Sequence, residues 1–431
     1  MEALLVVLFV IGYAIIALEY RLHIDKAATA IFLGATTWFL LFGVPLFVEG
    51  KVPPSIEAGL FHHLGEAASI LFFLLGAMTI VEVIDSYEGF QFVLRLMRIR
   101  TLWGFLVVLV GMTFFLSAVI DNLTATLLMV SLLQKVTPEE ERNVRLLGAS
   151  LVVLAANSGG AWSPLGDVTT TMLWIKGCIT EVSIIKKVFL PSLLSIGIPF
   201  LALGRLLRGA SVRVESALST SSEEIPQRVS FIVFLVGITG ILIVPILKVI
   251  FHVPPFLAML LSMGAVWLIT EIFYRRLGER VGEPRRLRVV SALERIDTPS
   301  LLFFLGILLA VGALGEIGVL RWLAQSLSTA VPSLDVVVFL MGVLSAVVDN
   351  VPLVAAAIEM YPLSEFPTDH RLWEFMAYAA GVGGNLLIIG SAAGVVAMGM
   401  ERIEFFWYLR RVSWIAFLGY ASGALVYVIL N

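Results

Sequence analysis

The sequence predicts an all-α membrane protein that crosses the bilayer about ten times. Hydrophobic residues make up 59% of the 431 residues and charged residues only 14%, whereas soluble domains carry about 25% charged residues. Many apolar runs reach about 20 residues, the length that an α-helix needs to span the hydrocarbon core. Because unpaired backbone groups are costly in lipid, such runs form helices that pack into a bundle.

The apolar runs divide into two halves with the same order of elements. The first half has runs at 3–19, 28–47, 67–84, 146–177 and 188–206, and the second has runs at 230–250, 254–274, 300–314, 374–400 and 406–430. Each half also holds one apolar segment with a polar interruption, at 101–136 and at 334–360. We therefore expect a first repeat over 1–206, a polar cytoplasmic linker over 207–229 and a second repeat over 230–431.

The two interrupted segments share a motif. Residues 117–126 read SAVIDNLTAT and residues 345–354 read SAVVDNVPLV, so that Asp121 and Asp349 lie 228 positions apart (349 − 121). A charged side chain inside a membrane is costly, and it marks a functional site by default. The motif predicts that both segments contribute to one site.

A second pair of polar stretches follows the first pair. Residues 157–171 read NSGGAWSPLGDVTTT, and residues 381–394 read GVGGNLLIIGSAAG. Their glycines, and Pro164, predict that the helices over 146–177 and 374–400 are interrupted near the middle of the membrane. Freed carbonyls, carboxylates and hydroxyls are hard oxygen ligands that suit a small hard cation.

Lysine and arginine bias predicts the orientation of the chain. Seven arginines lie between Arg275 and Arg295, and we place them and the linker in the cytoplasm, with both termini outside. Lys176, Lys186 and Lys187 do not fit this assignment. The orientation that we assign requires each Asp-Asn segment to enter and leave the membrane on the same side, as a re-entrant hairpin. A continuous broken helix that crosses the membrane is the alternative. Five crossings per half, an odd number, make the two halves inverted-topology repeats.

Several polar residues also have a simple structural explanation. Asn, Thr and Gly in membrane helices commonly serve helix packing. His62, His63, Glu66 and Glu82 around the third run are either pH-responsive or solvated at the interface. Glu316, Glu359 and His370 are expected at the ends of spans and are left out of the site. The motifs of ATP-driven pumps and soluble hydrolases are absent from the sequence, so we do not expect an enzyme.

The stretches DNLTAT, NSGGAWSPLGDVTTTMLW and DNVP together resemble the NhaD-type sodium/proton antiporters of the ion transporter superfamily. The resemblance implies a hairpin and an unwound helix at the site of each repeat. It also implies a homodimer with a scaffold and a moving transport domain, in a bacterial inner membrane. Related divalent-anion symporters carry Ser-Asn-Thr at the hairpin tips, where this chain has Asp-Asn. Two added carboxylates would repel a dianion, but they can hold Na⁺ or a proton.

The sequence therefore predicts a transporter that exchanges Na⁺ or Li⁺ for H⁺, with no cofactor and no nucleic-acid partner. Competition between Na⁺ and H⁺ for one carboxylate site is sufficient for exchange, and aspartates that share a site titrate as a coupled unit. An anion carrier for arsenite or a carboxylate, and a cation channel, are the alternatives. The predicted site residues are Asp121, Asn122, Thr124, Asn157, Ser158, Asp167, Thr169, Thr170, Ser345, Asp349, Asn350, Asn385 and Ser391.

Overall fold

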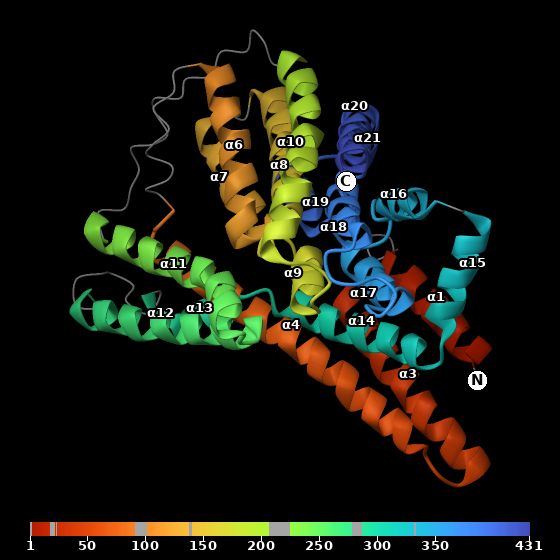
Figure 1. The fold of residues 1–431 in the computed structure, drawn as a ribbon. Helices are drawn as coiled ribbons and strands as arrows, with labels where there is room; N and C mark the ends of the chain where they lie inside the picture. Colours follow the sequence, from red (N-terminus) through yellow and green to blue (C-terminus); the bar gives the residue numbers. More distant parts are fainter. Residues whose placement is uncertain are drawn as a thin grey trace.

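The computed structural model describes residues 2–17, 22, 24–90, 101–137, 140–206, 225–277, 287–331 and 333–431. Most of the expected linker, 207–229, lies outside these residues. The elements within them are all helices (Figure 1), and nine of the described helices are long and apolar enough to cross a membrane. The prediction of an all-α protein with many membrane spans is confirmed.

The helices follow the predicted order along the chain. The first half contains α1 (Glu2–Ala17), α3 (Lys26–Glu49), α4 (Pro54–Ser86), α6 (Leu102–Ile120), α7 (Asn122–Val136), α8 (Arg142–Ala161), α9 (Val168–Ile175) and α10 (Glu181–Leu206). The second half contains α11 (Gln227–Phe251), α12 (Pro255–Leu277), α13 (Val289–Arg295), α14 (Thr298–Glu316), α15 (Val319–Ala330), α16 (Leu334–Leu344), α17 (Asn350–Met360), α18 (Arg371–Gly383), α19 (Ala392–Glu401), α20 (Phe405–Arg411) and α21 (Ser413–Leu430).

The four predicted interruptions all occur, but several other boundaries differ from the prediction; α10, for example, begins at Glu181 and not at residue 188. Helix α4 begins at Pro54, not at residue 67, because Pro54 occupies the first turn and the polar residues that follow lower the hydropathy without breaking the helix. The last predicted span is divided at Val412 into α20 and α21. Hydropathy locates an apolar run, whereas helix ends depend on local backbone geometry.

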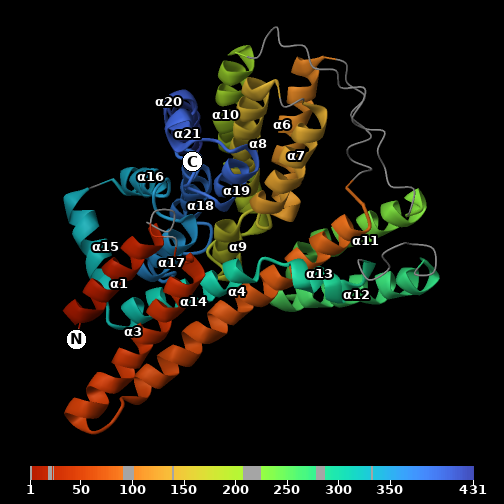
Figure 2. The same cartoon turned by 180° about the vertical axis from the view of Figure 1, so that it is seen from behind.

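The helices pack in two groups (Figures 1 and 2). In the group that we call the scaffold layer, α3 packs on α14 and α4 packs on α12, with α1, α11 and α13 beside them. In the group that we call the bundle, α8 contacts α6, α7, α10, α18 and α19, and α10 lies along α21. Helix α9 contacts α4 of the scaffold layer, and α17 contacts α14. The polar stretches that precede α9 and α17 therefore lie near the boundary between the two groups.

The same packing occurs in both halves. Helix α6 packs on α8 as α16 packs on α18, and α7 packs on α19 as α17 packs on α9. Ser117 donates a hydrogen bond to the Ala156 carbonyl (2.6 Å), and Ser345 donates one to the Ala380 carbonyl (2.8 Å). Corresponding helices of the two halves thus make corresponding contacts. The inverted orientation of the two halves across a membrane stays a prediction.

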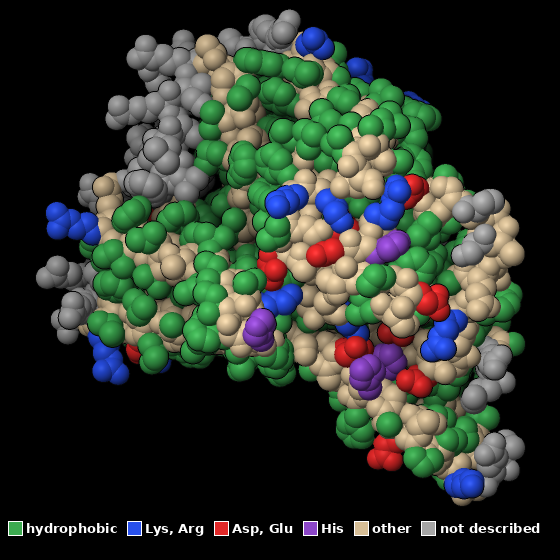
Figure 3. Space-filling model, in the orientation of Figure 1, with side chains coloured by type: hydrophobic (Ala, Val, Ile, Leu, Met, Phe, Trp, Pro, Cys, Tyr) green, Lys and Arg blue, Asp and Glu red, His purple; other side chains and the backbone are tan. Residues whose placement is uncertain are grey.

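The outer surface is strongly apolar. Phe47 is 90% exposed and Phe39 is 73% exposed on α3, and Trp414 on α21 is 72% exposed. Figure 3 shows hydrophobic side chains over most of the upper and left parts of one face, with charged side chains and histidines gathered lower down. Such an exposed apolar surface is expected for helices in contact with lipid.

Candidate ion-binding site

Each of the four polar stretches caps the N-terminus of a helix. Asp121 caps α7 by accepting from the Thr124 amide (2.8 Å), and Asp167 caps α9 by accepting from the Thr169 amide (3.0 Å). In the second half the corresponding caps are Asp349 on α17, through the Val351 amide (3.3 Å), and Ser391 on α19, through the Gly394 amide (3.1 Å). Helix N-termini carry partial positive charge, so the cap carboxylates are placed where negative charge is stabilised.

Asp167 lies at the centre of the site, and its side chain joins both halves of the chain. One carboxylate oxygen, Oδ2, accepts from the amide nitrogen of Asn122 (3.3 Å) and from that of Asn350 (3.5 Å). The other oxygen, Oδ1, accepts from the Thr169 hydroxyl (3.1 Å) as well as from its amide. Asp167 is only 2% exposed, so a buried carboxylate connects the starts of α7 and α17, which we call the two tips, to an interrupted helix.

A second buried network adjoins Asp167. Asn157 Oδ1 accepts from Asn122 (3.0 Å), while Asn157 Nδ2 donates to Asn385 Oδ1 (2.9 Å) and to the Ser391 hydroxyl (2.8 Å). Asn385 in turn lies within 3.5 Å of the Ser158 hydroxyl. The amide and hydroxyl groups of this network carry oxygen atoms close to the carboxylate, and oxygen atoms are the ligands that a small hard cation prefers.

The carboxylates of the two tips point to other partners. Asp121 Oδ2 accepts from the Thr124 hydroxyl (2.9 Å), and Asp349 Oδ2 pairs with Lys26 at the start of α3 (3.2 Å). Both tip carboxylates nevertheless lie near enough to Asp167 to interact with it electrostatically. The site is therefore acidic, with Asp167 in the middle and one aspartate on each side.

Asp121 has an unusual backbone conformation. Its φ is 73° and its ψ is 159°, a region that is essentially restricted to glycine. Its counterpart Asp349 has φ −50° and ψ 136°, which any residue adopts. Backbone strain of this kind persists only where the surrounding structure imposes it, and it is concentrated at functional sites.

Two predicted site residues bind backbone groups away from Asp167. The Thr170 hydroxyl donates to the Ala161 carbonyl (3.5 Å), and Ser345 holds its hairpin segment on α18 through the Ala380 carbonyl. Glycines allow the close contact between these elements, because a Cβ on Gly159 or Gly383 would collide with the backbone carbonyl of Phe114 or Gly342. The geometry thus gives Thr170 and Ser345 a packing role.

Sequence reasoning missed two groups that contact the site. Lys26 lies at the start of a span, where positive charge is common, and only its pairing with Asp349 connects it to the site. Ser195 in α10 donates to the Ser158 hydroxyl (2.9 Å), and a lone serine in an apolar run gave no signal. A pocket opens beside the first hairpin tip, between bundle and scaffold layer; it is lined by Asp121, Asn122, Val168, Phe73, Met259 and Phe304 among others.

The comparisons with known proteins agree with this geometry. A family model described as a citrate transporter (CitMHS) matches residues 3–383. Sodium/proton antiporter 1 of Arabidopsis thaliana is 42% identical, covering 100% of this chain and 73% of the relative. Sodium/proton antiporter 2 of the same plant is 41% identical over 98% of both chains, and the Na⁺/H⁺ antiporter NhaD of Alkalimonas amylolytica is 31% identical over 99% of this chain and 90% of the relative.

The membrane-spanning helices, the buried polar site and these matches define a secondary transporter and not an enzyme. The chain belongs to this transporter family, and its resemblance to the NhaD-type sodium/proton antiporters is confirmed.

Proposed function

We propose that the chain exchanges Na⁺ or Li⁺ for H⁺ and that Asp167 is the carboxylate for which the two ions compete. The observation that carries this proposal is the position of Asp167, which is buried and bound by an asparagine from each hairpin tip. A site that can be entered from either side needs one group in contact with both halves. Asp167 meets that requirement.

The surrounding groups suit both ions. Both oxygens of Asp167 accept hydrogen bonds here, from the asparagine amide nitrogens and from Thr169, as an ionised carboxylate does. A proton on the carboxyl group would instead need an acceptor. An amide group that turns about its last bond presents its oxygen instead, and Asn122, Asn157 and Asn350 would then offer oxygens to a bound Na⁺. Because ion and proton need the same oxygens of Asp167, each expels the other, which is the condition for exchange.

We further propose that the bundle moves against the scaffold layer in an elevator-like step. The two groups pack mainly within themselves, and the site lies on the bundle side of their boundary. The pocket beside Asp121 separates the hairpin tip from Phe73, Met259 and Phe304 of the scaffold layer. A movement along this boundary would carry the site without taking apart the packing inside either group.

A carboxylate carrier is the second candidate, because the matching family model is described as a citrate transporter. The acidic site weighs against it: Asp121, Asp167 and Asp349 cap three of the four converging helix ends and would repel a polyanion. Uptake of citrate without Na⁺/H⁺ exchange would decide for the carboxylate carrier. Na⁺ conduction uncoupled from proton movement would decide for a channel.

The experiment that tests the proposal measures the Na⁺-dependent dissipation of a pH gradient in everted membrane vesicles. Asp167→Asn keeps the shape of the side chain and removes its charge, so we expect the exchange to be lost, and Asp121→Asn should lose it as well. Glu57→Gln, an exposed residue in the first turn of α4, is the control and should exchange normally. Full exchange by both aspartate variants would refute the assignment.

Which membrane holds the protein, whether the protein is a homodimer and on which side its termini lie stay predictions. The relatives come from both a plant and a bacterium, so we keep the bacterial inner membrane as part of the proposal only. Labelling of cysteines introduced at the termini of vesicle-embedded protein would test whether both ends are outside. Crosslinking in intact membranes would test the homodimer.

A further inference from the structure

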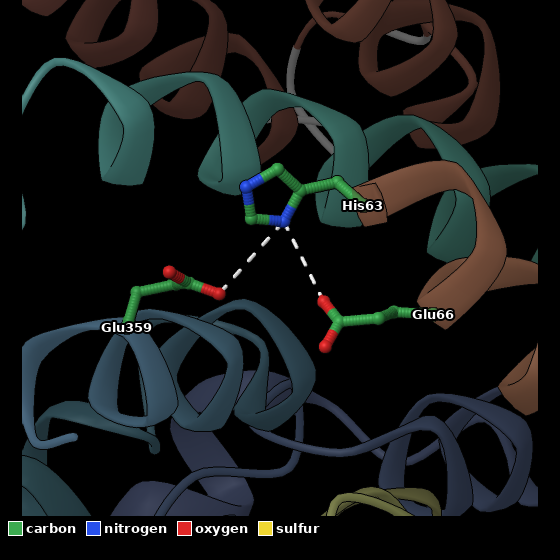
Figure 4. A group of neighbouring side chains, drawn as sticks. All are labelled: His63, Glu66 and Glu359. Atoms are coloured by element: carbon green, nitrogen blue, oxygen red, sulfur yellow. Dashed lines mark ion pairs between the residues drawn. The ribbon is translucent and has the colours of Figure 1, made fainter. Parts of the chain in front are cut away.

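A cluster of titratable side chains lies outside the Asp167 site, at the boundary between bundle and scaffold layer. His63 and Glu66 come from α4, and Glu359 lies on α17 (Figure 4). Glu316 ends α14. His63 Nδ1 lies 3.6 Å from Glu66 Oε2 and 3.9 Å from Glu359 Oε1. The proposed exchange at Asp167 does not require this cluster.

We propose that His63, Glu66 and Glu359 bind a divalent transition-metal ion that connects the bundle to the scaffold layer. One donor atom from each of the three residues lies within 4.8 Å of the others. Tetrahedral coordination at about 2.1 Å places neighbouring ligand atoms roughly 3.4 Å apart. The two distances from His63 Nδ1, 3.6 and 3.9 Å, need to shorten by only a few tenths of an ångström, and the two carboxylates need to approach each other by about 1 Å or more. One imidazole and two carboxylates suit Zn²⁺, Co²⁺ or Mn²⁺.

The orientation of His63 supports metal binding. Its other ring nitrogen, Nε2, lies 3.4 Å from Glu316 Oε1. A proton on Nε2 that is held by this carboxylate leaves the lone pair of Nδ1 directed between Glu66 and Glu359. Histidine ligands of metals are almost always oriented in this way by a carboxylate or carbonyl group. His63 is 9% exposed, so its ring is fixed by its surroundings.

Three glycines provide the space for these side chains. A Cβ on Gly312 would lie 2.7 Å from the His63 ring, one on Gly315 would lie 2.8 Å from the Glu359 carboxylate, and one on Gly59 would lie 2.6 Å from Cδ of Glu316. Larger residues at these positions would displace the ligands or their orienting carboxylate. A cavity lined by His63, Glu66, Glu359, Gly312 and Lys176 opens beside the three ligands.

Lys176 competes with the metal for one ligand. Its ammonium group pairs with Glu66 Oε2, and it follows α9 at the C-cap, close in sequence to the Asp167 site. A bound metal ion would take over Glu66 and displace Lys176, and it would hold α17 on α4. If the bundle moves during exchange as proposed above, metal binding slows the exchange.

Binding of Co²⁺ to the purified, chelator-treated full-length chain tests the site without any transport measurement. Four-coordinate Co²⁺ absorbs visible light, and we expect one bound ion per chain with micromolar affinity. His63→Gln and Glu359→Gln should each lose this absorption, and Glu316→Gln should weaken binding about tenfold. His252→Gln is the control, because His252 is an exposed histidine at the C-cap of α11, outside the cluster.

The results separate this proposal from the proposed function. Absence of stoichiometric binding by the unmodified chain overturns the metal site, as does unchanged binding in both His63→Gln and Glu359→Gln. If the unmodified chain binds, Zn²⁺ should inhibit Na⁺/H⁺ exchange by it and by His252→Gln at least tenfold more strongly than by His63→Gln. A chain that binds Co²⁺ but exchanges no Na⁺ would contradict the proposed function and leave the metal site standing.

Discussion

The amide nitrogen of Asn350 lies 3.5 Å from the Asp167 carboxylate, so the start of α17 in the second half contacts the interrupted helix of the first half. Asn122 donates to the same oxygen from the first hairpin (3.3 Å). The two tips are 228 residues apart (350 − 122) and share one acceptor. A change in the charge of Asp167 therefore alters the hydrogen bonding of both hairpins at once, which couples the two sides of the site.

Removal of either amide should weaken Na⁺ binding. Polar contacts to charged groups contribute about 1.5–3 kcal/mol. Asn122→Ala and Asn350→Ala each remove an amide oxygen proposed to contact Na⁺, so each should raise the apparent KM for Na⁺ roughly 10- to 100-fold. Since both amides share one acceptor, the double variant should show less than the product of the two effects. Asn143→Ala, at an exposed position early in α8, is the control for exchange in vesicles. If the KM of the double variant rose by the full product of the two single effects, the two amides would act independently, and the shared site would be contradicted.

The backbone at Asp121 predicts an unusual response to glycine. Asp121→Gly and Asp121→Ala both remove the cap carboxylate, but only glycine adopts φ 73° without strain. We expect the glycine variant to be the more stable of the two by about 1 kcal/mol, measured as the difference in thermal unfolding of the purified protein.

Asp349 supplies the matched pair for this comparison. Its φ is −50°, so Asp349→Gly should be less stable than Asp349→Ala by roughly 0.5 kcal/mol, because glycine gains more freedom in the unfolded chain. If the glycine variant were less stable than the alanine variant at both positions, the backbone strain at Asp121 would be absent in the protein.

The glycine pairs that hold hairpins to interrupted helices predict a third effect. A Cβ on Gly383 would run into the Gly342 backbone carbonyl, which cannot move without shifting α16. Gly383→Ala should therefore destabilise the protein by about 2 kcal/mol and impair exchange. Gly399→Ala in α19 meets nothing within 4 Å and should leave the thermal midpoint unchanged or raise it. Equal midpoints for the two variants would contradict the close contact between α16 and α18.

The sequence predicted the helix breaks closely because their causes are local. Asp, Asn, Gly and Pro in apolar runs end helices by short-range backbone chemistry, so the breaks before Asn122, Val168, Asn350 and Ala392 could be located without a structure. The roles within the tips were harder to predict. An aspartate that caps a helix turns toward that helix, so the next side chain, Asn122 or Asn350, is the one that reaches Asp167.

The His63 cluster was beyond the reach of sequence reasoning. Glu316 and Glu359 each end an apolar run, where a charged residue is normally solvated, and they lie far along the chain from His63. Only the packing of α14 and α17 near the first part of α4 brings them together. Tertiary contacts across several hundred residues leave no local pattern, whereas duplicated motifs at a fixed offset do.

Competition at one carboxylate predicts how exchange depends on pH. Ligand groups must lose their protons before they bind a metal ion, so acidification should raise the apparent KM for Na⁺ while the rate at saturating Na⁺ stays nearly constant. For one competing proton, KM rises about tenfold per pH unit on the acidic side. Dissipation of the pH gradient in vesicles, measured over a range of Na⁺ concentrations from pH 6 to 10, gives both quantities. A fall in the maximal rate at constant KM would instead place the proton on a separate group, and Asp167 would then bind Na⁺ alone.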